Sequence, residues 1–137
     1  MTFQRVILLT ALFLALTACF HPDYSPAIKA RAPIQAISTA LEAYKIDTGS
    51  YPSTAEGLAA LSVPSPYATN WKGPYLPTRD FASDPWGREY IYAFPGAHGP
   101  KPDIISLGSD GKPGGEGINA DITRWTELPA PSTRNSQ

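Results

Sequence analysis

The chain has 137 residues, which is enough for one domain with a modest hydrophobic core. Its formal net charge of −1 at pH 7 provides no basic surface for nucleic acid, so we expect no nucleic-acid partner. Fifteen prolines and eleven glycines predict short elements joined by many turns, and a single cysteine excludes an internal disulfide.

The N-terminal residues have the pattern of an export signal. Arg5 supplies a positive flank, and thirteen apolar or threonine residues run from Val6 to Ala18. That run is shorter than the about 20 residues that a membrane-spanning helix needs. It ends in Leu16-Thr17-Ala18-Cys19, which resembles the lipobox of bacterial lipoproteins, where signal peptidase II cuts before a cysteine that is then acylated. We therefore expect residues 1–18 to be a signal peptide and residues 19–25 a tether.

Cys19 is accordingly predicted to be lipidated. The alternative is an incidental or buried thiol, which we favour less. Several acyl chains, at about 0.8 kcal/mol per buried CH₂, would anchor the protein stably. Lipidation would place it in the bacterial cell envelope, facing the periplasm. Phe20 rather than aspartate follows the cysteine, which in the lipoprotein pattern implies no inner-membrane retention. We therefore expect the lipid anchor to lie in the outer membrane.

A long amphipathic helix is predicted after the tether. Ser25 and Pro26 form its start, as N-cap and first helical residue. Lys45 in the last turn and Gly49 just beyond it predict the end. Pro33 should kink the helix or mark its true beginning. Apolar residues recur at spacings of three and four and predict the buried face: Ala30, Ile34, Ile37, Leu41 and Tyr44.

Shorter elements are predicted in the remainder of the chain. A capping box at residues 53–56 should begin a short helix that buries Leu58 and Leu61. Residues 89–94 alternate aromatic and smaller side chains, and residues 103–107 follow after a turn that contains proline and glycine. These two segments predict an antiparallel hairpin that lies on the long helix.

A glycine-rich segment, Ser106 to Trp125, follows the second predicted strand. It contains five glycines, with Asp110 and Asp121 toward its two ends. A long loop without periodicity is uncommon in a compact domain unless it is functional. Two carboxylates, with carbonyls that glycine allows to turn inward, could form the oxygen cage that calcium prefers. A surface turn whose aspartates bond nearby backbone N–H groups is equally favoured by composition alone.

Two other loop types are excluded for this segment. The alternating acidic positions and closing glutamate of an EF-hand are missing. A phosphate-binding loop is excluded because Gly111-Lys112 is followed by Pro113 rather than by serine or threonine at a helix start.

Six motifs follow one another between about residue 30 and residue 125. They are Ala30 to Ala36 with Tyr44 to Pro52, Glu56-Gly57-Leu58, Trp71 to Leu76, Asp84-Pro85-Trp86-Gly87, Ser106 to Gly111, and Ala120 to Trp125. In this order they resemble the major pseudopilin, the G subunit, of bacterial type II secretion systems. Without the resemblance, the aromatic residues in these motifs would be interpreted as side chains that close the edge of the core, or as a binding surface.

The resemblance implies an α+β, pilin-like fold over residues 26–127. In that fold a long N-terminal helix packs on a small antiparallel sheet that has a calcium-binding C-terminal loop. The remaining residues, 128–137, are expected to be a disordered tail.

The resemblance also implies a Ca²⁺ cofactor and its ligands. Asp110 and Asp121 occupy the positions of the calcium-ligating carboxylates. Leu107 and Lys112 occupy those that give backbone carbonyls. Further ligands between residues 115 and 119 stay open, because the loop varies in length within the family.

The N-terminus departs from the family pattern. Family members are cut by prepilin peptidase after a glycine, and a glutamate at the fifth position of the new helix serves filament assembly. In this sequence the first glycine is Gly49 and no acidic residue precedes Asp23. We therefore expect a pseudopilin head domain on a lipid anchor, which prepilin peptidase does not cut and which does not replace a major pseudopilin.

The function expected from the sequence is non-enzymatic. We expect a calcium-stabilised lipoprotein that works with, or derives from, a type II secretion apparatus. Its expected partners are other secretion-system or pseudopilus proteins and the membrane. A small periplasmic ligand-binding or enzymatic lipoprotein is the alternative, and a deep pocket lined by ionisable groups would favour it. Against catalysis, the only histidines are His21 and His98, without a nucleophile motif and nearby base. His98, in a turn, is expected to be solvated.

Overall fold

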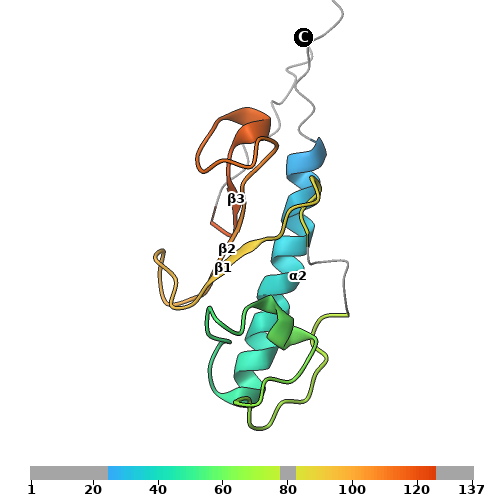
Figure 1. Ribbon diagram of the computed structural model, residues 1–137, viewed down its shortest axis with the longest axis vertical. Helices are drawn as coiled ribbons and strands as arrows, with labels where there is room; N and C mark the ends of the chain where they lie inside the picture. Colours follow the sequence, from blue (N-terminus) through green and yellow to red (C-terminus); the bar gives the residue numbers. More distant parts are fainter. Residues whose placement is uncertain (1–24, 78–82, 126–137) are drawn as a thin grey trace, which may run out of the picture.

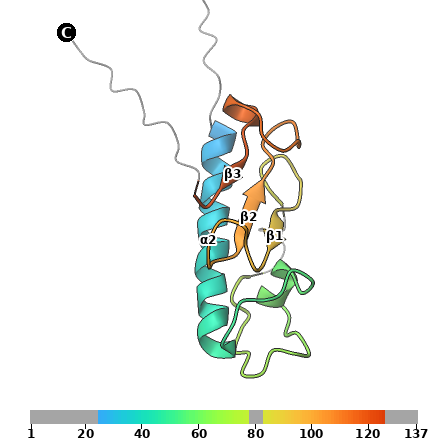
Figure 2. The same cartoon turned by 90° about the vertical axis from the view of Figure 1, so that its left-hand side faces the viewer.

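The computed structural model describes residues 25–77 and 83–125. One long helix packs along a small antiparallel sheet, and a connecting segment with a short 3-10 helix covers the C-terminal end of the long helix (Figures 1 and 2). The predicted signal peptide, Cys19 and the predicted tail lie outside the described residues. The elements are α2 (Ser25–Thr48), the 3-10 helix η1 (Leu58–Leu61), β1 (Ile91–Ala93), β2 (Asp103–Ser106), the 3-10 helix η2 (Gly117–Asn119) and β3 (Ile122–Thr123).

Helix α2 begins at Ser25 and is 24 residues long, with Pro33 inside it. Pro33 therefore does not mark the beginning of the helix. Gly49 ends it, because its N–H donates a 2.8 Å hydrogen bond to the Lys45 carbonyl while its own φ is +91°. A left-handed residue just past the last turn is the usual way to close a helix, and glycine adopts it without a Cβ penalty.

The predicted apolar face of α2 forms one wall of the hydrophobic core. All five of its residues are buried, from Ala30 at one end to Tyr44 at the other. The other wall comes from η1 and the sheet. Its fully or nearly buried residues are Leu61, Tyr90, Tyr92, Ile104 and Ile122. Since burying one large apolar side chain stabilises a fold by about 1.5–3 kcal/mol, this contact holds the helix on the sheet.

The sheet has three antiparallel strands in the order β1-β2-β3. The predicted hairpin is confirmed, with Tyr92 opposite Ile104 in the register of β1 and β2. The third strand, β3, was not predicted. It pairs Ile105 with Thr123, and its two residues are too few to display the alternation by which strands are recognised.

The predicted capping box is present, but the helix after it is shorter than a full α-helix. The Ser53 hydroxyl and N–H both donate to Glu56 Oε2, at 2.8 and 2.9 Å. Gly57, at φ +61°, then redirects the chain into the four-residue 3-10 helix η1. Leu61 is fully buried as predicted, whereas Leu58 is only partly buried against the core.

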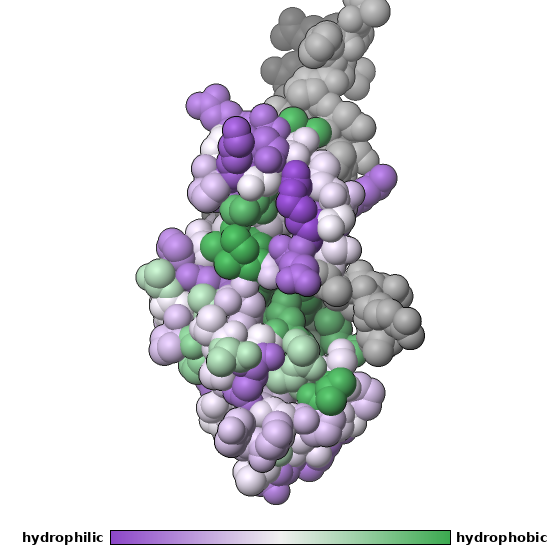
Figure 3. All heavy atoms as spheres, in the orientation of Figure 1, coloured by the Kyte–Doolittle hydropathy of each residue, from purple (hydrophilic) through white to green (hydrophobic). Residues whose placement is uncertain are grey.

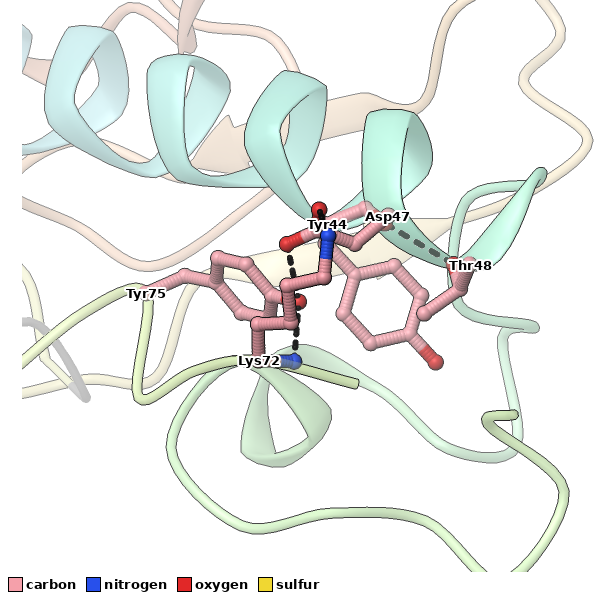
Figure 4. A network of polar contacts seen from close by, with 5 residues as sticks. All are labelled: Tyr44, Asp47, Thr48, Lys72 and Tyr75. Carbon is pink, nitrogen blue, oxygen red and sulfur yellow. Dashed lines mark hydrogen bonds and ion pairs between the residues drawn. The ribbon is translucent and has the colours of Figure 1, made fainter. Parts of the chain in front are cut away.

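The aromatic segment after η1 closes the edge of the core. Of the two interpretations of these aromatic residues, core edge or binding surface, the first is thereby confirmed. Trp71 and Tyr75 both pack against the core cluster, and the Trp71 indole N–H donates to the Ala60 carbonyl at 3.0 Å. Figure 4 shows Tyr75 and Lys72 near the last turn of α2. There Tyr75 Oη donates a 2.8 Å hydrogen bond to Asp47, and Lys72 Nζ lies 3.1 Å from the same carboxylate. The Tyr75 hydroxyl, followed by Lys72, holds the pKa of Asp47 below its usual value.

The surface carries large apolar side chains at scattered positions. Figure 3 shows hydrophobic residues over the middle of one face, with mostly hydrophilic residues toward both ends of the domain. The most exposed of the large apolar residues are Ile28, Ile46, Val63, Tyr67 and Ile91. Single exposed apolar residues are normal on soluble domains.

Within residues 25–77 and 83–125, no helix has the length and apolar character needed to cross a membrane.

Candidate functional site

The glycine-rich loop leaves the sheet after β2 and returns to it as β3, so neighbouring strands hold its two ends. Both views show it at the end of the molecule where α2 begins (Figures 1 and 2). Leu107 is half-buried directly after β2, and Asp121 is half-buried directly before β3. Asp110 and Lys112 are exposed between them. The four residues predicted as calcium ligands therefore belong to one closed loop.

Backbone hydrogen bonds fold the loop back on itself. The Ser109 N–H donates to the Ile118 carbonyl at 2.9 Å, and the Asp121 N–H donates to the Gly114 carbonyl at 3.1 Å. Gly108 allows the two halves to approach, because a Cβ at this position would lie 2.7 Å from the backbone of Asn119 and Ala120. With φ at +64°, Gly108 also has a conformation that other residues rarely adopt.

Both aspartates accept a hydrogen bond from a backbone N–H group of the loop, but only that of Asp110 has the two-residue spacing expected of a simple turn. Asp110 Oδ1 accepts the Lys112 N–H at 3.0 Å, and Asp121 Oδ2 accepts the Gly114 N–H at 3.0 Å. Asp121 differs in its second oxygen, Oδ1, which is buried and has no hydrogen-bond partner among the described residues. A buried carboxylate oxygen without a partner is costly, so this atom fits a site that a cation would complete.

Any metal in the loop would have to use backbone oxygen as well as carboxylate. Among the residues that the structure describes, no group of three or more His, Cys, Asp or Glu side chains is arranged to hold a metal ion. Calcium takes six to eight oxygen ligands and readily includes backbone carbonyls. The predicted set, two carboxylates with the carbonyls of Leu107 and Lys112, therefore has the chemistry of a calcium site.

Arg88 also contacts the loop, and sequence reasoning missed it. Its two terminal nitrogens donate to the carbonyls of Gly108 and Ser109, at 2.9 and 2.6 Å. The residue follows the Asp84-Pro85-Trp86-Gly87 motif. Because its partners lie about twenty positions further along the chain, no local pattern could have revealed the contact.

His98 is exposed to solvent, as expected, but its ring also has two neighbours. Its ring is about half exposed, but Nδ1 lies 2.9 Å from Asp103 Oδ2 and the ring stacks on Trp125 with centroids 4.2 Å apart. The β1–β2 hairpin brings His98 near Asp103, and the pairing of β3 with β2 brings Trp125 to the same end of the sheet. Burial raises the pKa of Asp103, but the hydrogen bonds from His98 and the Ala97 N–H outweigh it and leave that pKa below its usual value.

Two hollows beside α2 bear on the alternative of a ligand-binding or enzymatic protein. Their volumes are about 230 and 460 Å³, and Gln35 and Arg124 line both. The described residues that line them include no histidine and no cysteine. In the first hollow Glu42 and Lys101 pair with each other at 2.6 Å. The serine and threonine of the first hollow, Ser38 and Thr39, donate their hydroxyls to the helix carbonyls of Ile34 and Gln35 rather than to a base.

The chain resembles known proteins over most of its length. The family model "Type II secretion system (T2SS), protein G" matches residues 20–125. The type II secretion system core protein G of Pseudomonas aeruginosa is 44% identical over 109 residues, which are 77% of this chain and 75% of the relative. The core protein G of Vibrio cholerae is 42% identical over 100 residues, 71% of this chain and 66% of the relative.

A solved structure has the same fold. It is the major pseudopilin from the type 2 secretion system of enterohaemorrhagic Escherichia coli, with a TM-score of 0.63 and 33% sequence identity over 80% of this chain and 90% of that one. The predicted packing of a long helix on a small antiparallel sheet is thereby confirmed. The chain belongs to the protein G family of type II secretion systems and has the pseudopilin fold.

Proposed function

We propose that this protein is a non-enzymatic, lipid-anchored pseudopilin-like subunit that works with the type II secretion apparatus. The observation that carries the proposal is the family match over residues 20–125, which takes in the whole helix and sheet. The relatives are named as core components of that apparatus, and the structural neighbour as its major pseudopilin. A domain of the same family and fold is expected to contact the same kind of partner, namely other pseudopilus proteins.

The second part of the proposal is that calcium stabilises the head domain through the glycine-rich loop. The carboxylates of Asp110 and Asp121 and the carbonyls of Leu107 and Lys112 would hold the ion. The buried, unpartnered Oδ1 of Asp121 supports this assignment, because the ion would supply the missing partner. Calcium would join the two ends of the loop, and a ligand that binds only the folded state stabilises it.

The third part is a lipid anchor at Cys19. Its support is the sequence Leu16-Thr17-Ala18-Cys19 after a thirteen-residue apolar run. Acylation would keep the head domain at the periplasmic face of the envelope, with the outer membrane as the expected location. There the domain could meet pseudopilus proteins without itself entering the filament.

Cross-linking in the native host tests the association with the secretion apparatus. Pseudopilus subunits should co-purify with the tagged full chain after cross-linking. A matched control carries residues 1–24 of this chain fused to an unrelated soluble domain, and it should recover none of them. Equal recovery with the two proteins, or recovery with neither, would count against a role for the head domain in secretion.

A further inference from the structure

The turn formed by residues 84–88 contacts the end of β2 and the start of the glycine-rich loop. Asp84 closes this turn, because its buried Oδ1 accepts the N–H groups of Trp86 and Arg88 at 3.0 and 2.9 Å. Its Oδ2 accepts a 2.6 Å hydrogen bond from the Ser106 hydroxyl, at the last residue of β2. The turn is thus fixed to the strand from which the loop departs.

Arg88 extends from this turn along the first residues of the loop. One guanidinium nitrogen donates to the Gly108 carbonyl and the other to the Ser109 carbonyl. Gly111 makes room for the side chain, because a Cβ at that position would lie 2.5 Å from Arg88 Nε. A residue with a Cβ at position 111 would therefore collide with the Arg88 side chain in this position.

A guanidinium suits this position in two ways. It stays charged at every physiological pH, and its planar fork directs two donors at two adjacent acceptors, which the ammonium of a lysine does not do. Hydrogen bonds with a charged partner are also stronger than neutral ones. Within the described residues Arg88 forms no ion pair with Asp110 or Asp121, so both carboxylates stay available to a metal ion.

We propose that Arg88 is a positioning residue that holds the first turn of the glycine-rich loop in the calcium-free protein, and so presets the Leu107 carbonyl and the Asp110 carboxylate for the ion. The calcium part of this inference rests on the function proposed above.

Two substitutions separate the geometry of the guanidinium from its charge. Arg88→Lys keeps the positive charge and loses the fork, whereas Arg88→Met loses both. Lys101→Met is the matched control, because it removes one positive charge from an exposed ion pair with Glu42 outside the loop.

Amide hydrogen exchange in the calcium-free, detergent-solubilised full chain gives the first readout. The Ser109 amide, which donates to the Ile118 carbonyl, should exchange at least about tenfold faster in both Arg88 variants and at the wild-type rate in Lys101→Met. The Ile105 amide in β2 reports whether each variant is folded. Unchanged exchange at Ser109 in folded Arg88→Met would overturn the proposal.

Calcium affinity, measured by isothermal titration calorimetry, gives the second readout. Both Arg88 variants should bind calcium about tenfold more weakly, a difference of about 1.4 kcal/mol. Wild-type affinity in Arg88→Lys with tighter binding in Arg88→Met would mean that Arg88 acts only as a repelling charge, which contradicts the proposal. If the wild type binds no calcium, the calcium part of the proposed function fails, and the exchange of the Ser109 amide alone decides the role of Arg88.

Discussion

The fully buried hydroxyl of Ser106 donates a 2.6 Å hydrogen bond to Asp84 Oδ2, across twenty-two residues of sequence. This bond joins the last residue of β2 to the turn that carries Arg88. It therefore connects two motifs of the family pattern, one around Asp84 and one beginning at Ser106. The bond lies where the sheet ends and the loop begins, because Ser106 is the last residue of β2.

Ser106→Ala should lower the free energy of unfolding by about 1–3 kcal/mol, because it leaves a buried carboxyl oxygen without its donor. Denaturant unfolding of the variant and the wild type measures the loss. Thr39→Ala is the control, since the exposed Thr39 hydroxyl donates to the Gln35 carbonyl of its own helix. A loss in Ser106→Ala no greater than that in the control would mean that the buried bond contributes little.

Local periodicity was sufficient to predict the helix and the hairpin. The apolar face from Ala30 to Tyr44 repeats every three or four residues, and each of its five positions is buried. Tyr90 and Tyr92 alternate with exposed neighbours, and both are buried. These features follow from the geometry of a single element, so a window of sequence contains them.

The contacts that shape the loop could not be predicted in this way. Arg88 reaches Gly108 and Ser109, and His98 stacks on Trp125, because strand pairing brings distant segments together. The buried state of Asp121 Oδ1 likewise depends on how the loop folds back, which glycine-rich composition alone leaves undetermined. The resemblance to pseudopilins supplied the ligand positions, and that assignment stays a prediction.

The protein should lose stability in alkaline solution as its buried tyrosines ionise. Burial, with a smaller contribution from Asp84, raises the pKa of Tyr90 to about 12. The unfolded chain has a tyrosine pKa of about 10, so the folded state holds this proton more tightly. The stabilisation is complete below about pH 10 and is lost as the pH rises through about 12.

Urea unfolding at a series of pH values above 9 measures this effect. The wild type should lose stability with rising pH, and Tyr90→Phe should lose it less steeply because it has no proton to release at that site. Identical slopes for the two proteins would show that ionisation of Tyr90 is not linked to folding.

Cys19→Ser should abolish acylation, because signal peptidase II processing and lipid attachment both need the cysteine. Labelled palmitate fed to cells should enter the wild type and not the variant. The intact mass of the membrane-bound wild type should also equal that of a chain beginning at Cys19 plus its acyl groups. Equal labelling of the two proteins, or a membrane-bound chain of uncleaved mass, would argue for a different anchor.

Calcium should raise the melting temperature of the wild type through the glycine-rich loop. At a free concentration one hundred times the dissociation constant, a ligand that binds only the folded state adds about 2.7 kcal/mol of stability. Asp110→Ala and Asp121→Ala should each lose most of this shift, because either change leaves the site short of a carboxylate. Of the two, Asp121→Ala should be the more stable without calcium, since it removes a buried oxygen that has no partner among the described residues.

Thermal unfolding of the full chain in detergent, with calcium or with a chelator, measures these shifts. Glu89→Ala is the matched control, because it removes an exposed carboxylate outside the loop and should keep the wild-type calcium response. Trp125, four residues after Asp121, offers a fluorescence signal for ordering of the loop. Identical melting curves with and without calcium for the wild type would leave the segment as a glycine-rich turn, held by Arg88 and by the hydrogen bonds that its two aspartates accept from the backbone.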